Sequence, residues 1–467
     1  MMKSIPWFAA LCLLYPLAAA GMMAVLAGEV LAQPPAAEWK IGLAQVKITP
    51  EQPIFMSGYA SRTKPFERVE ADLWAKALYL EDGRGGRAVV ITTDLLGFPA
   101  SIADPMCERI REKTGLRREQ VLINSAHIHS GPMIGADDAA RDNVPADEAR
   151  KVAEYTRKLV DKIVDLAAQS VSRPEPARLS MAGGVVDFPM NRRQWTPNGV
   201  VLGANPRGFA DRSVPVLRVE GADGKVKAAL FGAGVHNTTL RGNSYEICGD
   251  YAGFAQAFVQ EQLPGVQAMF MLGCAGDADP YPHGTMALAK AHGLTLGKEV
   301  CRVLAGKTEP VRGPLRVAFE RVELPLQKPP AREELEKQAA GRGTTAWVAK
   351  QMLERLNAGQ KLPEHYATPL AVWQFGEDLT LVALSGEVVS DYIPLIEKAV
   401  GPLRLWVTAY NNDVYGYLPS SRVISEGGYE CRGLYAGGIG YFATAAQDVQ
   451  VNQVRELARK VGRKVPE

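Results

Sequence analysis

Short apolar runs recur along the chain at the length of β-strands, each bounded by Gly, Asp or Pro. Between these runs, three segments place apolar residues about every 3.6 positions, as amphipathic helices do, at residues 145–171, 251–263 and 285–306. The expected strands cover residues 87–97, 121–130, 213–221, 228–236, 268–277, 379–387 and 403–411. The pattern predicts an α/β or mixed α+β fold, with a large β-sheet core flanked by helices.

The segments between these runs predict one continuous domain over residues 41–467, because no charged or low-complexity linker and no internal repeat divides them. Residues 173–195 read as a polar connection, a short strand and then a loop that carries Asn191, Arg192 and Arg193. Residues 327–362 are charged and helix-prone. We expect them to form an insertion that covers one face.

Composition and charge exclude two classes of protein. The 467 residues are 47% hydrophobic and 22% charged, which is typical of a globular protein with a large core and unlike a disordered chain. Lysine and arginine total 53 against 51 acidic residues, without a long basic run, so no nucleic-acid partner is expected. Nothing in the chain predicts a protein partner.

The N-terminus has the pattern of a secretory signal. Lys3 precedes an apolar run, and small residues lead to Ala32. We therefore expect a signal peptide over residues 1–32, a short linker over 33–40, and export to the periplasm or the extracellular space. The apolar run is longer than a minimal signal core, so an uncleaved membrane anchor remains the alternative.

Export would place the cysteines that follow the leader in an oxidising compartment. Their number is odd and no spacing resembles a CxxC metal knuckle, so we expect mostly buried thiols with room for one disulfide. These residues are Cys107, Cys248, Cys274, Cys301 and Cys431.

Groups suited to metal chemistry cluster where the apolar runs end. If residues 121–130 form a strand, its period of two directs His127 and His129 to one face. A catalytic zinc takes about three protein ligands and keeps a position for water, so two histidines and one glutamate from separate strand ends would suffice. The residues at such ends are His127, His129, His236, Asp277, Asp279, Glu387, Tyr415 and Tyr417.

Each of these residues could also have a purely structural role. An isolated His-x-His serves as a hydrogen-bonding pair on a strand, and His236 alone suits a core histidine. Glu387 could cap a helix, and Asp277 and Asp279 could be turn residues. Their joint occurrence favours a metal site, although the stretch HIHSGP does not match the HxHxDH of metallo-β-lactamases.

The same segments resemble one family, the neutral/alkaline non-lysosomal ceramidases. Residues 126–132 are similar to its Thr-His-Thr-His-Ser-Gly-Pro stretch. The resemblance continues in order over residues 41–446. The further matching segments are MSGYASR (56–62), PMNRR (189–193), VHNTT (235–239), CGDYAGFA (248–255), LSGEVVS (384–390), VYGYLPS (414–420) and GGYE (427–430).

This resemblance implies a zinc-dependent amidase. The implied zinc ligands are His127, His236, Glu387 and Tyr417, and the residues implied to face the substrate amide are His129, Arg192 and Tyr429. Arg192 or Tyr429 would stabilise an oxyanion, and His129 would hold the carbonyl or move a proton. A second, structural Ca²⁺ or Mg²⁺ near Asp94 or Asp250 is left open.

Two departures from the family matter. Asp279 stands where the family carries an active-site serine, so no seryl acyl-enzyme can form there, and the carboxylate could act as a base. The second departure is one of length: since the sequence ends at Glu467, we expect the catalytic domain alone, without the family's C-terminal immunoglobulin-like domain. If that domain helps peripheral membrane contact, a smaller N-acyl substrate becomes more plausible.

The sequence therefore predicts an exported zinc-dependent hydrolase that cleaves the N-acyl bond of ceramide or a related N-acyl lipid with metal-activated water. The alternatives are hydrolysis of another amide or ester on the same scaffold, and a non-catalytic binding protein that retains the metal site.

Overall fold

The computed structural model describes residues 38–436 and 438–466. The expected signal peptide and the first five linker residues lie outside this range. Strand β1 (Trp39–Lys47) begins two residues before the expected start of the domain. Within the described part of the chain, no helix combines the length and the apolar character that a membrane span requires.

A nine-stranded mixed sheet forms the centre of the molecule. Its strands pair antiparallel except for β10 with β12 and β4 with β5, which are parallel. The fold is therefore mixed α/β, as the sequence predicts. The order is β12 (Gln267–Leu272), β10 (Val226–Ala233), β9 (Ser213–Gly221), β6 (Glu175–Val185), β1, β3 (Trp74–Asp82), β4 (Arg87–Thr93) and β5 (Val121–Ser125), with β14 (Glu309–Val311) beside β6.

A second sheet of four strands packs face to face on the first. It consists of β15 (Leu315–Pro325), β16 (His365–Phe375), β17 (Leu379–Leu384) and β19 (Leu405–Thr408). Between the sheets lies a buried cluster that includes Leu80 from the large sheet and Trp373 and Trp406 from the small one. The rings of Trp39 and Phe375 meet across this interface at 5.7 Å.

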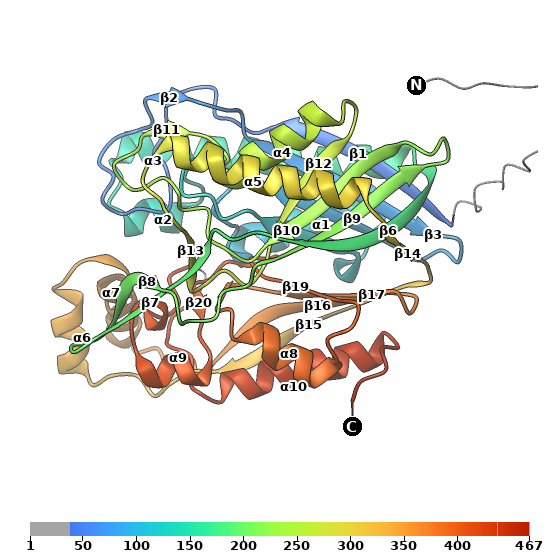
Figure 1. Ribbon diagram of the computed structural model, residues 1–467. Coiled ribbons are helices and arrows are strands. Elements are labelled where there is room, and N and C mark those ends of the chain that lie inside the picture. The colour runs from blue at the N-terminus through green and yellow to red at the C-terminus, as the bar shows by residue number, and fades with distance from the viewer. Residues whose placement is uncertain (1–37, 437, 467) are drawn as a thin grey trace, which may run out of the picture. The chain divides into compact units, whose positions relative to one another are not determined.

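Helices cover the outer faces of both sheets, so the molecule has four layers (Figure 1). Helices α1 (Ala100–Thr114), α3 (Ala146–Ser172), α4 (Asp250–Gln262) and α5 (Met286–Ala305) lie on the large sheet. Helices α8 (Tyr392–Val400) and α10 (Ala446–Lys460) lie on the small sheet. Helix α3 follows the apolar period, because Val152, Leu159, Ile163 and Leu166 are its buried positions.

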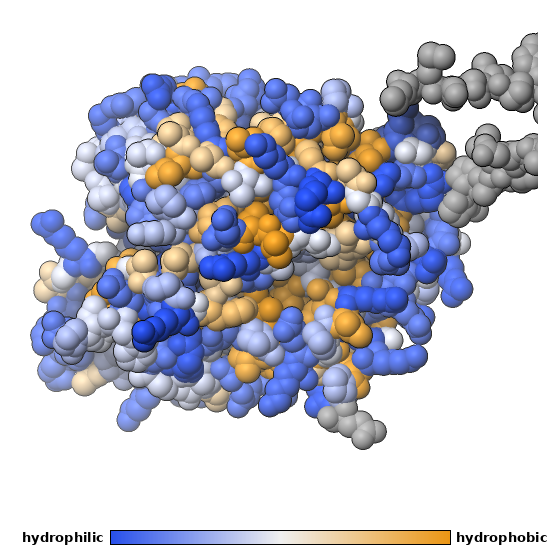
Figure 2. All heavy atoms as spheres, viewed as in Figure 1, coloured by the Kyte–Doolittle hydropathy of each residue, from blue (hydrophilic) through white to orange (hydrophobic). Residues whose placement is uncertain are grey.

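Hydrophobic side chains reach the surface in a band between helices α5 and α8, whereas hydrophilic side chains cover the outer helices (Figure 2). A cavity of about 690 Å³ lies between the same layers, with Ala233, Ile393 and Trp406 among its lining residues. It contains none of the candidate site residues.

Smaller elements surround one end of the two sheets. Strands β7 (Pro189–Thr196), β8 (Gly199–Asn205) and β13 (Ala278–Pro280) form a three-stranded sheet. Residues 191–193 therefore belong to a strand and not to the expected loop, because β7 pairs on both of its edges. The other short elements are β2 (Arg68–Val69), α2 (Ala136–Arg141), β11 (Glu246–Ile247), β18 (Glu387–Val388), β20 (Tyr417–Leu418) and α9 (Ser421–Glu426), with 3-10 turns at Arg118–Gln120 and Tyr429–Cys431.

The charged segment near residue 340 is helical, as expected. Helices α6 (Arg332–Ala339) and α7 (Gly343–Asn357) share a small core with Leu335, Met352 and Ile439. The five cysteines after the leader are free thiols, so the structure does not form the disulfide for which the sequence left room.

One side chain joins three strands that are distant in the sheet order. Asn124, near the end of β5, donates from Nδ2 to the Ala409 carbonyl at 2.8 Å, next to β19. Its Oδ1 accepts from the Leu272 amide of β12 at 2.9 Å. Strands β5 and β12 are the opposite edges of the large sheet. Asn124 therefore brings the loops that follow β5, β12 and β19 to one place.

Candidate functional site

The pair His127 and His129 lies in a loop. Strand β5 ends at Ser125, and His127 has φ 56°, a left-handed conformation that non-glycine residues rarely adopt. The expectation that a strand extends through this pair is therefore wrong. Their rings still face one site, with centroids 4.9 Å apart, because Ile128 forms a bridge with Asn237 and holds the loop against the one that carries His236.

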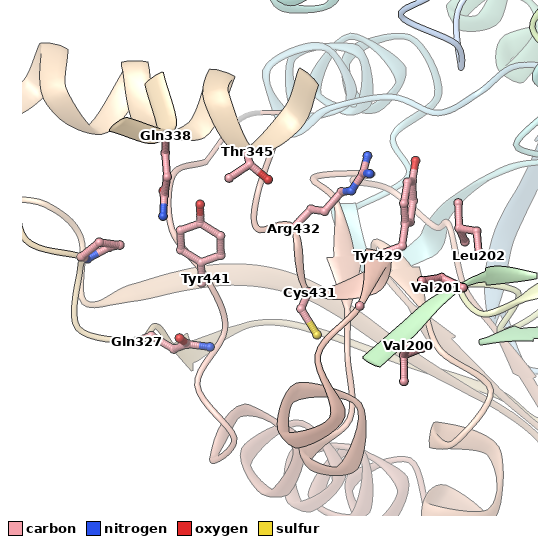
Figure 3. A pocket seen from close by; sticks show the side chains of 12 residues that line it. Val200, Val201, Leu202, Gln327, Gln338, Thr345, Tyr429, Cys431, Arg432 and Tyr441 are labelled. Carbon is pink, nitrogen blue, oxygen red and sulfur yellow. The ribbon is translucent and has the colours of Figure 1, made fainter. Parts of the chain in front are cut away.

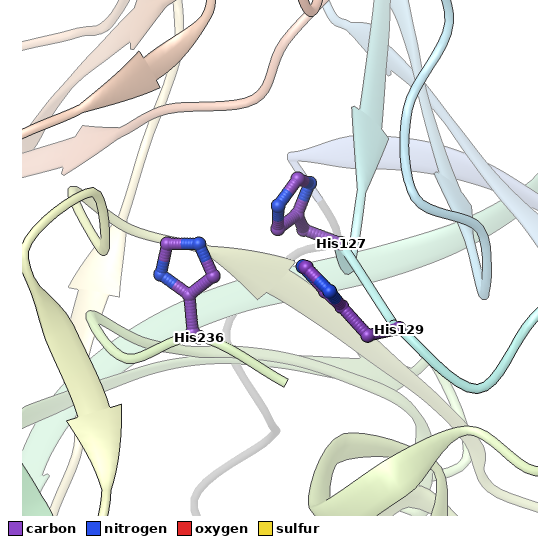
Figure 4. A group of neighbouring side chains, drawn as sticks. All are labelled: His127, His129 and His236. Atoms are coloured by element: carbon purple, nitrogen blue, oxygen red, sulfur yellow. The ribbon is translucent and has the colours of Figure 1, made fainter. Parts of the chain in front are cut away.

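Four side chains from three segments of the chain converge on one point. Figure 4 shows the rings of His127, His129 and His236 together, and one nitrogen of each lies within 4.8 Å of the others. Glu387 reaches the same point: its Oε2 is 3.0 Å from His127 Nε2 and 2.9 Å from His236 Nε2. In a tetrahedral zinc site, ligand atoms lie about 3.3 Å apart, so this spacing suits ligands of one ion.

The outer nitrogens of the two imidazoles define their tautomers. His127 Nδ1 is 2.6 Å from the Leu96 carbonyl, and His236 Nδ1 is 2.5 Å from the Ala275 carbonyl. A carbonyl only accepts, so Nδ1 donates, and a neutral ring then has a lone pair on Nε2. Two lone pairs facing one carboxylate oxygen repel each other unless a cation lies between them. This donor set and its backbone supports fit a bound metal ion.

The third histidine is also available as a ligand. Both ring nitrogens of His129 are buried and have no hydrogen-bond partner within the described residues. Burial lowers the pKa of His129 well below its usual value, so the ring is neutral. Gly58, with φ 93°, makes room for it, because a Cβ there would lie 2.5 Å from His129 Nδ1. A metal ion bound by His127 and His236 can therefore take its further ligands from His129 or from the predicted pair, Glu387 and Tyr417.

Tyr417 is adjacent to Glu387. The strands β18 and β20 are parallel and place Glu387 directly opposite Tyr417. The Tyr417 ring stacks 6.5 Å from the His236 ring, and its hydroxyl accepts a hydrogen bond from Arg192 Nη2 at 2.9 Å. The four predicted zinc ligands thus lie together.

Arg192 connects the metal-binding groups with the predicted substrate-facing residues. It is buried on β7, and besides Tyr417 it binds Asp279 through Nη1 at 3.1 Å and Glu430 through Nε at 3.0 Å. Its guanidinium lies 5.4 Å from the centre of the Tyr429 ring. The structure therefore brings all the predicted catalytic residues to the same place as the metal group.

Asp279 is held as an ion. Its Oδ2 accepts from Arg241 Nη2 at 3.1 Å, and its Oδ1 accepts from Thr238 as well as from Arg192. Burial alone would raise the pKa of Asp279, but the positive charges of Arg192 and Arg241 hold it well below its usual range. A carboxylate with such a low pKa is a weak proton acceptor.

Sequence reasoning missed three contributors. Tyr435 donates to Glu387 Oε1 at 2.5 Å, Glu430 pairs with both Arg192 and Arg193, and Arg241 binds Asp279. Glu430 lies in the GGYE segment, and the resemblance of that segment to the family could have identified it. Tyr435 and Arg241 stand in no apolar run or motif, so only their contacts reveal them.

The other candidate groups have structural partners. Tyr415 donates to the Ser385 carbonyl at 2.9 Å, and Asp277 accepts from the Ser390 amide at 2.7 Å. Asp94 accepts from the Trp74 amide and Asp250 from the Leu240 amide. Within the described residues, neither Asp94 nor Asp250 belongs to a group of metal-binding side chains. A second cation there stays a prediction without support.

Comparisons with known proteins agree on one family. The family model "Neutral/alkaline non-lysosomal ceramidase, N-terminal" matches residues 39–323. Neutral ceramidase A of Dictyostelium discoideum is 26% identical over 270 residues, which are 53% of this chain and 36% of that protein. The neutral ceramidase of Pseudomonas aeruginosa is 26% identical over 260 residues, which are 52% of this chain and 37% of that protein. The matched stretches thus span little more than a third of these relatives.

Solved structures share the fold. The crystal structure of the Pseudomonas aeruginosa neutral ceramidase superposes with a TM-score of 0.69 at 19% identity, covering 92% of this chain and 77% of that one. A ceramidase complexed with C2 superposes with a TM-score of 0.68 at 18% identity and the same coverage. Since the family model covers more than half of the sequence, the chain belongs to the neutral/alkaline non-lysosomal ceramidase family.

Proposed function

We propose that this protein is an exported hydrolase that cleaves the amide bond of ceramide or a related N-acyl lipid, with zinc held by His127, His236, Glu387 and Tyr417. The observation that carries the proposal is the contact of Glu387 Oε2 with two imidazole Nε2 atoms at 3.0 and 2.9 Å, each imidazole being fixed by a backbone carbonyl. This is the ligand chemistry that zinc prefers.

Zinc, when bound, supplies a water of lowered pKa and polarises a carbonyl oxygen. The chain supplies the remaining functions. Arg192 is a fixed cation beside Tyr417 and Tyr429, placed to stabilise the negative charge that develops on the substrate oxygen. His129 is neutral and has both ring nitrogens free, so it can take a proton from the attacking water and deliver it to the leaving amine. The water oxygen bonds to the carbonyl carbon, the carbon–nitrogen bond breaks, and the products are a carboxylate and an amine.

In this scheme Asp279 does not act as a general base. Its carboxylate is paired with Arg192 and Arg241, and its low pKa makes it a poor proton acceptor. We propose that Asp279 orients Arg192 toward the substrate. The proton of the water reaches the leaving amine by relay through His129: burial makes this imidazole a weak base too, but its two unpartnered nitrogens can accept and donate in turn, whereas the Asp279 oxygens are held by Arg192 and Arg241.

The first test measures zinc content by elemental analysis and the hydrolysis of a fluorescent ceramide, on the full chain and on His236→Ala. The matched control is His365→Ala, because His365 is an exposed histidine on β16. We expect about one zinc per chain with turnover in the control, and loss of both in His236→Ala.

The outcomes separate the alternatives. Zinc without ceramide turnover would direct the search to another amide or ester on the same site. A protein that binds no zinc when the metal is supplied would refute the proposed chemistry and favour a binding protein.

A further inference from the structure

A cavity of about 600 Å³ lies beside the candidate site, between the β7–β8 hairpin and the inserted helices α6 and α7. Figure 3 shows side chains from both elements around it. Its lining includes Val200, Val201, Leu202, Gln338, Tyr429 and Tyr441.

Tyr429 belongs to both the cavity and the candidate site. Its ring lies 5.6 Å from the ring of Tyr417 and 5.4 Å from the guanidinium of Arg192. On the cavity side, the Arg432 guanidinium stacks on the Tyr429 ring at 3.5 Å. A ligand whose reacting group lies at Arg192 can therefore extend past Tyr429 into this space.

The hairpin side of the cavity is apolar. Val200, Val201 and Leu202 are consecutive on β8, and the last two are 43% and 50% exposed. Exposed aliphatic side chains at the edge of a cavity are favourable positions for an alkyl chain, because each gains free energy when a ligand removes it from water.

The opposite side of the cavity presents uncharged hydrogen-bonding groups. The Tyr441 hydroxyl and Gln338 Oε1 are both buried and have no partner within the described residues. The Gln338 nitrogen donates to Glu334 at 3.0 Å, so its oxygen is left as an acceptor. In Figure 3 the side chains of Gln338 and Tyr441 extend toward each other. Buried polar groups without partners are costly, so a ligand group that pairs with them gains affinity.

The charge of the lining selects the kind of ligand. Among the described residues that line the cavity, Arg432 is the one charged residue and none is a carboxylate, so none of them recognises a cation. A phenol and an amide oxygen match a neutral hydroxyl, which both donates and accepts. In a ceramide, the amine half carries hydroxyl groups beside an alkyl chain, whereas a simple fatty acyl chain carries none.

We infer that this cavity binds the hydroxyl-bearing amine half of an N-acyl substrate, with its alkyl chain against Val200, Val201 and Leu202 and a hydroxyl paired with Tyr441 and Gln338. The assignment of this ligand as a substrate rests on the proposed amide hydrolysis. The binding itself does not depend on turnover.

The test measures binding to the full, zinc-supplemented chain with two fluorescent ureas that replace the scissile amide. One urea is built from sphinganine, and the other from hexadecylamine, which lacks hydroxyls. We expect the protein to bind the sphinganine urea about tenfold more tightly, as one or two hydrogen bonds allow. Tyr441→Phe should bring this preference close to one without weakening the hexadecylamine urea. Leu202→Ala should weaken both ureas alike.

Matched controls are Tyr281→Phe and Leu403→Ala, whose side chains are 49% and 80% exposed and lie outside the cavity lining. Both should leave the two affinities unchanged. A hydroxyl preference that persists in Tyr441→Phe, or a wild type that binds neither urea, would overturn the inference. A protein that shows the preference but does not hydrolyse ceramide would support the cavity assignment and refute the proposed function.

Discussion

The substitution Asp413→Asn tests how burial changes the pKa of a carboxyl group near the candidate site. Asp413 is fully buried between helix α1 and strand β16. Its Oδ1 accepts from the Ala100 amide at 2.9 Å, and its Oδ2 accepts from the Tyr366 hydroxyl at 2.7 Å. Burial raises the pKa of this carboxyl from 3.8 to about 6 in spite of these donors.

The direction of the pH dependence follows from this shift. The folded state binds the proton more tightly than the unfolded state does, so the stability from protonated Asp413 is complete below pH 3.8 and is lost as pH rises through about 6. A tenfold change in proton affinity is worth about 1.4 kcal/mol, so the loss amounts to about 3 kcal/mol. Asparagine stays neutral at every pH, keeps an acceptor for Ala100 and can donate to the Tyr366 oxygen.

The assay is urea unfolding of wild type and Asp413→Asn between pH 4 and 8. Because part of the loss already occurs below pH 4, the variant should gain about 2.5 kcal/mol relative to wild type between pH 4 and 8, and nearly all of this gain should appear between pH 4 and 6.5. The altered hydrogen bond changes the free energy of unfolding by the same amount at every pH, so it does not affect how the difference between variant and wild type changes with pH. Asp161→Asn, at an exposed ion pair with Arg109, is the control and should give a nearly constant difference. A difference for Asp413→Asn that is also constant with pH would refute the argument from burial.

Three further predictions concern the site itself. Gly58→Ala should lower ceramide turnover by about tenfold or more in steady-state kinetics, because its Cβ would lie 2.5 Å from His129 Nδ1; unchanged kinetics would contradict this role for Gly58. Glu430→Gln should lower the free energy of unfolding by about 3–5 kcal/mol in urea, because it leaves two buried guanidiniums with one carboxylate fewer, and a loss below about 1 kcal/mol would contradict it. Zinc added to chelator-treated protein at about 100 times its dissociation constant should stabilise the fold by about 2.7 kcal/mol, which a thermal scan detects; an unchanged midpoint would argue against a metal site.

The mixed α/β class could be predicted from the sequence because local periodicity encodes burial. Helix α3 keeps one apolar stripe over its whole length, and the expected helix at residues 145–171 agrees with it closely. The expected strands were found as well, but the expected range of residues 121–130 continued past the true end of β5 at Ser125. Apolar and polar residues continue to alternate there, whereas the backbone turns at His127 because of long-range contacts.

The metal-binding residue types could also be predicted, because they stand at the ends of apolar runs, where side chains of an α/β fold meet. The residues that pair with the site residues could not be predicted from the sequence. Arg192 reaches Asp279 and Glu430 only because β7 pairs with β13 and packs against the 429–431 turn, contacts between residues 87 and 238 positions apart. Tyr435 meets Glu387 across 48 positions, and no local pattern encodes that distance.

The sequence by itself determined the periodic elements and which of them end in chemically useful side chains, since both depend on neighbouring positions. Only the tertiary structure decided how these ends meet. Asn124 joins the opposite edges of the large sheet, and the lone pairs of His127 and His236 become adjacent to Glu387 through that closure. The cavity beside Tyr429 likewise exists only because the 332–357 helices pack near a hairpin more than a hundred residues earlier in the chain. Such contacts depend on the free energy of the whole packed chain, which no segment contains.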